Sequence, residues 1–499
     1  MIRANSDTLI IVSSKLYTAA VSIVLLPILL EHLGSEQYGL IGAFVVIQAC
    51  IQILDAGISG TLTRQSIITQ VNYVSFELFI KKAELVFVYF LCLTVAIAYV
   101  GFELSNLFAK GWFNSELPES LLKQCATLMF LIISIRFFQG PFKSILLSFE
   151  KHRLLSTIDI VYATINGPMI VFLLLYYNGD VSDYLILQLI AVFIVLCWIA
   201  VCTIRTTSEK LSLLRERIKA DDSLVETSLA SLIKFGFKLS ILSILWVIVN
   251  QSDKVVLTTY MPLKDYAFYA IALSLIGLLS IFTSTMIQTV RPRFTSLFNS
   301  ENHLDMERLL KNSAINLVSI LTPLVVFLIA FGHNVIELWT GNSQASQQVM
   351  IYLPYLLTGS FFVALSEFSF IILYAKGDLT AHTKFYSLAS MIIIPLNIYV
   401  ASKYLGEGSA KLFMLVNASI FLTWSMYNLH RFFSGAVKLF IVIVSVSLMI
   451  SLILAYSVYV LGVESDLIQV LVAVLTGAVT IVLCYLALNR CDINIHFKG

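Results

Sequence analysis

YGLIGAFVVIQACIQILDAGISGTLT, residues 38–63, is a continuous apolar stretch of 26 residues with one charged side chain, Asp55. A helix needs about 20 apolar residues to cross a bilayer. Polar and apolar residues do not alternate in this stretch, as they would in a strand of a membrane barrel. We therefore predict a transmembrane helix here.

Comparable runs extend over the whole chain. The chain has 499 residues, of which 59% are hydrophobic and 12% charged, and its mean hydropathy of +0.89 is not that of a soluble domain. We therefore predict an all-α, polytopic membrane protein of about fourteen transmembrane helices. The thirteen further runs are at 9–31, 83–106, 121–148, 154–176, 183–204, 231–259, 265–290, 308–331, 347–375, 383–404, 409–429, 437–461 and 467–488.

The charges of the loops agree with this number of spans. Lys and Arg gather in every second loop, and the other loops carry mainly Asp and Glu, with Lys110, Lys264 and Lys403 as exceptions. Basic loops face the cytoplasm. Both termini fall on the basic side, so we expect both in the cytoplasm.

Motifs of soluble catalysis are missing from the sequence. It contains no P-loop, HExxH, GxSxG or CxxC pattern, which excludes a nucleotide-driven pump within this chain and gives no reason to expect a cofactor or metal. The net charge of +2 does not suggest nucleic-acid binding. Uphill transport would need coupling to an ion or to the substrate gradient.

A weak internal repeat divides the chain. EHLGSEQYGLIGAF (31–44) resembles TTYMPLKDYAFYAIA (258–272) at an offset of six spans, which predicts two parallel six-helix lobes. We expect an N-lobe at 1–204, a cytoplasmic linker at 205–230 and a C-lobe at 231–430. Residues 431–499 would then form two accessory helices and a tail.

Charges inside the spans are candidates for function, because each costs at least about 2.5 kcal/mol at the membrane centre. The interiors of the last two spans contain none, and these spans are expected to be peripheral. The charges are Lys15, Asp55, Arg136, Asp159, Lys234, Lys238, Asp253, Lys254 and Glu367.

The basic residues have two interpretations each. Arg136, in the middle of its span, either contacts an anion in a central cavity or pairs with Asp159. Lys15 and Lys238 occupy matching positions in the two lobes and either contact substrate or extend to the surface. Arg64 and Arg291 are positive-inside anchors or substrate contacts at the cytoplasmic mouth.

The acidic residues also have two interpretations each. Asp253 either couples protons or neutralises its neighbour Lys254. Asp55, which Gly57 and Gly60 follow, is a cavity acid or lies beside a small-residue packing seam. Glu367 poses a similar choice.

Two stretches resemble a known family. LLEHLGSEQYGLIGAFVVIQACIQILDAGISGTLTRQ (29–65) is similar to the opening of Wzx-type polysaccharide flippases, and NQSDKVVLTTYMPLKDYAFYAIA (250–272) to the start of their C-terminal lobe. These flippases belong to the multidrug/oligosaccharidyl-lipid/polysaccharide (MOP) exporter superfamily. The resemblance covers the whole chain in span pattern, and in sequence only these stretches.

The resemblance implies a transporter, not an enzyme, in the bacterial inner membrane. It would move an undecaprenyl-diphosphate-linked oligosaccharide, such as an O-antigen repeat unit, to the periplasmic leaflet by alternating access around a central cavity. It also implies a polysaccharide polymerase and a chain-length regulator as partners. Lys15, Arg136 and Lys238 would be cavity cations, although the family often has Arg at the two Lys positions.

Two other functions stay open. A drug or small-cation exporter of the same superfamily would be favoured by an acidic cavity, whereas these charges show a slight excess of cations. A membrane-embedded glycosyltransferase or polymerase would need a sizeable loop outside the membrane, and the sequence has no such loop.

Overall fold

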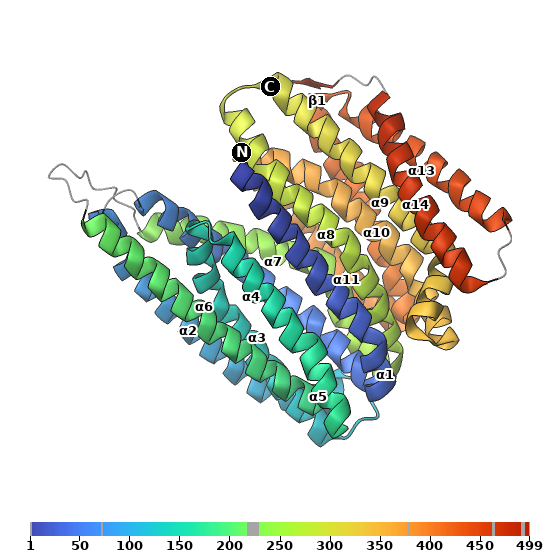
Figure 1. Ribbon diagram of the computed structural model, residues 1–499, viewed down its shortest axis with the longest axis horizontal. Coiled ribbons are helices and arrows are strands. Elements are labelled where there is room, and N and C mark those ends of the chain that lie inside the picture. The colour runs from blue at the N-terminus through green and yellow to red at the C-terminus, as the bar shows by residue number, and fades with distance from the viewer. Residues whose placement is uncertain are drawn as a thin grey trace. The chain divides into compact units, whose positions relative to one another are not determined.

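The computed structural model describes six parts of the chain (Figure 1). Side chains within these parts are described except at 2–9, 12, 52–58, 61, 64, 109, 229–240 and 299. The described parts are 2–70, 73–216, 229–377, 379–461, 465–490 and 495–498.

The described chain is almost entirely helical and divides by its internal contacts into two units, residues 1–267 with 386–394 and residues 268–385 with 395–499. Unit 1 contains these elements: α1 (Ile2–Thr69), α2 (Tyr73–Leu107), η1 (Phe108–Trp112), α3 (Glu119–Ser148), α4 (His152–Thr164), η2 (Ile165–Met169), α5 (Ile170–Tyr177), α6 (Val181–Arg215) and α7 (Leu229–Tyr260). The following helix, α8 (Leu263–Asn299), begins in unit 1 and continues into unit 2.

Unit 2 holds the remaining elements, apart from the segment of α11 that belongs to unit 1. They are α9 (His303–Thr340), α10 (Ser343–Lys376), α11 (Thr380–Ile420), η3 (Phe421–Ser425), α12 (Met426–Phe432), β1 (Phe433–Ser434), α13 (Ala436–Val460), α14 (Asp466–Arg490) and β2 (His496–Phe497).

Twelve helical stretches of the described chain are long and apolar enough to cross a membrane. Two of them are broken by a single residue, at Gly34 in α1 (φ +76°) and at Leu405 in α11 (φ +48°). Predicted spans 9–31 and 38–63 lie on either side of Gly34, and 383–404 and 409–429 on either side of Leu405. The predicted all-α, multi-pass membrane fold is confirmed.

Helix packing in unit 1 centres on α1 and α3. Helix α1 contacts α3, α4 and α7, and helix α3 also contacts α2 and α6. A buried apolar cluster of Leu146, Ile158, Val195 and Ile199 joins α3, α4 and α6. Gly39 lets the backbones of α1 and α8 approach closely, since a Cβ there would lie 1.9 Å from the Leu263 carbonyl oxygen.

Helix α9 organises unit 2, where it contacts α10, α13 and α14 (Figure 1). Val326, Phe327 and Phe331 of α9 are buried against Ala455 of α13 and Ala473 of α14. The contact division places α7 in unit 1, whereas the sequence assigns it to the second lobe. The predicted lobe boundaries at 204, 230 and 430 stay a prediction.

Candidate functional site

Arg136 is held against an aromatic ring in unit 1. Its Nη2 donates a hydrogen bond to the Tyr162 hydroxyl of α4, and its guanidinium carbon lies 4.8 Å from the centre of the Tyr162 ring. Its Nε is buried and has no hydrogen-bond partner among the described residues. Arg136 is therefore fixed in position while one of its donors stays unused.

Asp159 lies one turn before Tyr162 on α4, but it does not form an ion pair with Arg136. Both side chains are described, and no oxygen–nitrogen approach within 4.0 Å joins them. The strongest electrostatic partner of Asp159 is Lys143, followed by Arg136 and Lys15. The structure therefore gathers three basic residues around one carboxyl group.

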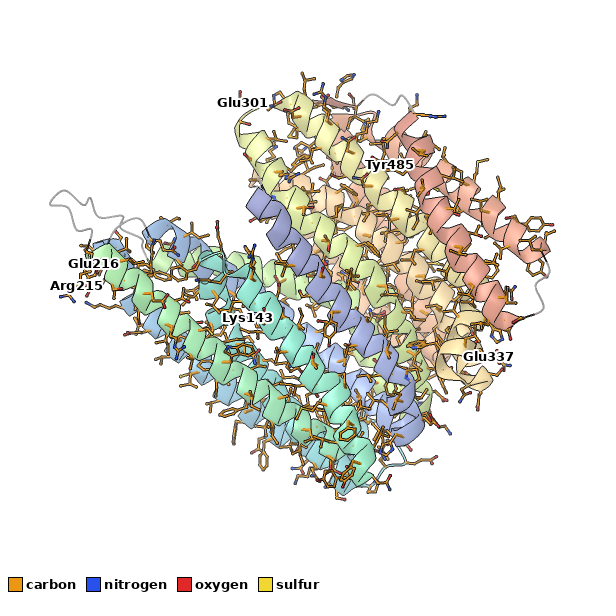
Figure 2. All side chains as sticks on the ribbon, in the orientation of Figure 1. Lys143, Arg215, Glu216, Glu301, Glu337 and Tyr485 are labelled. Atoms are coloured by element: carbon orange, nitrogen blue, oxygen red, sulfur yellow. The ribbon has the colours of Figure 1, made fainter. Side chains whose placement is uncertain are left out.

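Lys143 was not among the charges singled out from the sequence. It follows Arg136 by seven residues on α3, which returns it to nearly the same helix face after two turns. Figure 2 shows it among the side chains of unit 1. The sequence feature that points to Lys143 is its place inside the predicted span 121–148. We name Lys15, Arg136, Lys143 and Asp159 the basic cluster.

The neighbouring part of α1 is fixed by close packing against α4 and η2. The Tyr17 hydroxyl and the Thr164 Oγ1 are 2.8 Å apart, and a Cβ at Gly167 would lie 2.4 Å from a Val21 methyl group. Pro168 lies within η2 and lacks an N–H group, which accounts for a local departure from the α-helical hydrogen-bond pattern. This packing fixes the segment of α1 that carries Lys15 beside α4.

Asp253 and Lys254 form a buried ion pair on α7. Lys254 Nζ lies 3.2 Å from Asp253 Oδ1 and donates a 2.6 Å hydrogen bond to the Asn250 carbonyl oxygen. Both side chains are buried, with 6% and 3% of their surface exposed. This is the arrangement expected when Asp253 neutralises Lys254.

Arg291 is enclosed by aromatic rings in unit 2. Its guanidinium carbon lies 5.0 Å from the centre of the Phe370 ring and 5.3 Å from that of Tyr374, both on α10. Its Nε is also buried without a partner in the described structure. Glu367, one turn before Phe370, interacts electrostatically with Arg291. The structure thus brings these two predicted residues together.

Three predicted site residues lie outside the described side chains. The backbones of Asp55 and Arg64 are within α1 and that of Lys238 is within α7, as is that of Lys234. Their assignment as cavity residues stays a prediction.

Solved structures share the fold of this chain at low sequence identity. Lipid II flippase MurJ in an inward closed conformation aligns with a TM-score of 0.73 and 15% identity, over 97% of this chain and 100% of that chain. An inward-facing MATE family transporter of the MOP superfamily gives a TM-score of 0.62 at 14% identity, over 84% of this chain and 97% of that chain. A MOP superfamily transporter from Pyrococcus furiosus gives 0.54 at 15% identity, over 85% and 94%.

A match to a protein-family model shows the family of this chain, whereas the solved structures show only its fold. No curated protein matches the sequence. The model described as "Polysaccharide biosynthesis protein" matches residues 5–298, which is more than half of the chain and includes both stretches that resemble the Wzx-type flippases. That resemblance is confirmed, and the chain belongs to the polysaccharide biosynthesis protein family.

Proposed function

We propose that this protein is a flippase that moves an undecaprenyl-diphosphate-linked oligosaccharide from the cytoplasmic to the periplasmic leaflet of the bacterial inner membrane. Membership of a polysaccharide biosynthesis family and the fold shared with a lipid II flippase support this activity. The glycan would be an O-antigen or related surface polysaccharide repeat unit. A polymerase and a chain-length regulator would act on it after translocation.

The basic cluster is the observation that carries the proposal. Three basic side chains lie around one carboxyl group in a membrane protein, where a basic side chain needs an anionic or aqueous partner. A diphosphate is an anion with several acceptor oxygens. Arg136 would supply directed donors to it, and Lys15 and Lys143 would act as point charges.

An apolar cavity in unit 2 supports a lipid substrate. It has a volume of about 530 Å³ and is lined by α9, α10 and α13. Apart from the hydroxyl groups of Thr322, Thr358, Tyr456 and Tyr459, its lining side chains are apolar. A polyisoprenoid chain gains free energy by leaving water, and the side chains of this cavity offer it mainly apolar contacts.

Glu367 is our candidate for ion coupling. Asp253 is paired with Lys254, and Asp159 belongs to the basic cluster. Glu367 instead has one electrostatic partner identified among the described residues, Arg291, which aromatic rings hold nearby. Binding of a proton or a cation at Glu367 would weaken the electrostatic attraction between Glu367 and Arg291. Ion binding would in this way be linked to the position of α10.

A drug exporter is the second function within the same fold. An exporter of organic cations needs acids in its binding site, and the basic cluster has the opposite excess. The charge of unit 1 therefore favours the anionic lipid over a cationic drug.

Deleting the gene and analysing lipid-linked intermediates tests the proposal. We expect repeat units to accumulate on the cytoplasmic leaflet and surface glycan to fall, with both restored by the wild-type gene. Normal surface glycan and unchanged intermediates in the deletion strain would refute the flippase assignment.

A further inference from the structure

The C-terminal residues return to the helices of unit 2 as a short strand. β2 pairs antiparallel with β1, with Phe433 opposite Phe497 and Ser434 opposite His496. The Lys498 amide donates a 2.8 Å hydrogen bond to the Phe432 carbonyl oxygen, and the Ser434 hydroxyl donates to the His496 carbonyl oxygen at 3.1 Å. We name residues 495–498 the C-terminal strap.

Phe497 anchors the C-terminal strap in an aromatic site. Its ring stacks on His303 at a centroid distance of 4.7 Å and an interplanar angle of 19°. The ring centroid is also 5.3 Å from that of Phe433 and 6.2 Å from that of Phe298. Aromatic contacts of this kind each contribute beyond the area they bury. The ring joins the end of α8, the start of α9 and the strand that precedes α13.

Glu307 holds the backbone of the same residue. Its Oε1 accepts a 2.7 Å hydrogen bond from the Phe497 amide, and its Oε2 lies 3.8 Å from Nδ1 of His496. The Glu307 side chain is 14% exposed, so this charge-assisted hydrogen bond is largely shielded from water. Glu307 lies one turn after His303 on α9, and the two side chains together receive Phe497.

A second attachment joins α14 to the opposite end of α9. Asn334 Nδ2 donates to Asp466 Oδ1 at 2.6 Å and to Gln469 Oε1 at 3.0 Å. The C-terminal strap and this contact fasten the α13–α14 hairpin near the first and the last turns of α9. The part of α9 between these two attachments, residues 322–331, lines the apolar cavity, and side chains of α10 and α13 complete the lining.

We propose that the C-terminal strap is a conformational device that keeps the α13–α14 hairpin closed against α9. Release of Phe497 frees the start of α13 to move while the Asn334 contact acts as the hinge. The separation of α13 from α9, and with it the width of the apolar cavity, is then set by the strap. This device does not depend on which lipid the protein carries.

Hydrogen exchange of the full-length protein in detergent micelles tests the strap. In Phe497→Ala we expect the rate of amide exchange to rise at least about tenfold over wild type at residues 432–434, at the first turn of α9 and at the first turn of α13. Exchange at the start of α14, beside Asn334, should not change. Lys498→Ala is the matched control, because its side chain is exposed and the strap contact is made by its backbone amide.

Glu307→Gln is a second variant that preserves shape and an acceptor oxygen, and it should accelerate exchange at the same three places by a smaller factor. Size-exclusion elution of each variant verifies that it is folded. Unchanged exchange at the start of α13 in both variants, with the strap itself released, would overturn the proposal.

Discussion

Arg136 is the residue on which the proposed substrate contact depends most. Lysine at this position would keep the charge but lose the planar donor set and the stacking on Tyr162. We expect Arg136→Ala to lower surface glycan at least about tenfold, and Arg136→Lys to retain a measurable part. The readout is surface glycan normalised to protein level, and full activity of both variants would remove Arg136 from the site.

Lys143 offers a separate test of the basic cluster. If it adds charge for a diphosphate, Lys143→Ala should reduce translocation roughly threefold to tenfold, and Lys143→Arg should restore most of it. Lys123→Ala is a matched control, because Lys123 is an exposed lysine on the same helix. Equal activity of Lys143→Ala and Lys123→Ala, both at wild-type protein level, would contradict the role of Lys143.

Glu367 is expected to separate coupling from translocation. Glu367→Gln cannot lose a proton or bind a cation as a carboxylate does. It should abolish the stimulation of flipping by an ion gradient and leave downhill flipping within about twofold of wild type. Initial rates in proteoliposomes with and without the gradient measure this. Gradient stimulation that survives in Glu367→Gln assigns coupling elsewhere.

At this scale the sequence predicts which positions matter better than which groups they contact. The intramembrane location of Arg136, Asp159 and Glu367 follows from their place in apolar runs. The partner of Arg136 does not, because Tyr162 lies on another predicted span, 154–176, and apolar runs do not show which faces of two spans pack together. The sequence does not distinguish Lys143 from a lysine that reaches the membrane surface, because it lies near the end of the predicted span 121–148.

At the scale of the element, α1 shows how a membrane helix can break without a loop. The sequence predicts two spans separated by residues 32–37. In the structure both belong to α1, which is interrupted only at Gly34, whose positive φ suits glycine. The break at Leu405 had no comparable signal, because leucine rarely adopts such a conformation. Apolar runs therefore locate spans well, while the form of the connection depends on tertiary packing.

The contact of α1 with α8 gives a prediction for the element. A methyl group at Gly39 would overlap the Leu263 carbonyl oxygen, which cannot move without displacing the start of α8. We expect Gly39→Ala to destabilise the protein by about 1–3 kcal/mol. Gly60→Ala on the same helix is the control, since a Cβ there has no atom within 4 Å. Equal thermal midpoints for the two variants would show that the close approach is not needed.

At the scale of the whole molecule, hydropathy and loop charge were sufficient for the class of fold. Apolar runs require helices in lipid because every backbone polar group must be satisfied within its own segment. How the helices divide into bodies is not contained in those patterns. Contacts place α7 with unit 1, although the repeat of 31–44 and 258–272 suggests that a second lobe begins with it. The apolar runs give the order of the spans along the chain, whereas side-chain packing decides which spans belong to the same unit.

The basic cluster and the apolar cavity each match one part of the proposed substrate. Unit 1 carries the basic cluster, and unit 2 carries an apolar cavity lined by α9, α10 and α13. An anionic diphosphate suits the first feature, and a long hydrocarbon chain suits the second.

Translocation in proteoliposomes measures the proposed flipping itself. The purified protein is reconstituted with an undecaprenyl-diphosphate-linked oligosaccharide, and the fraction of glycan accessible to an external glycosidase is followed over time. We predict protein-dependent movement of the glycan between leaflets, and Arg136→Ala should slow this movement at least about tenfold. A rate equal to that of protein-free vesicles, with the reconstituted protein folded and an ion gradient imposed, would contradict it.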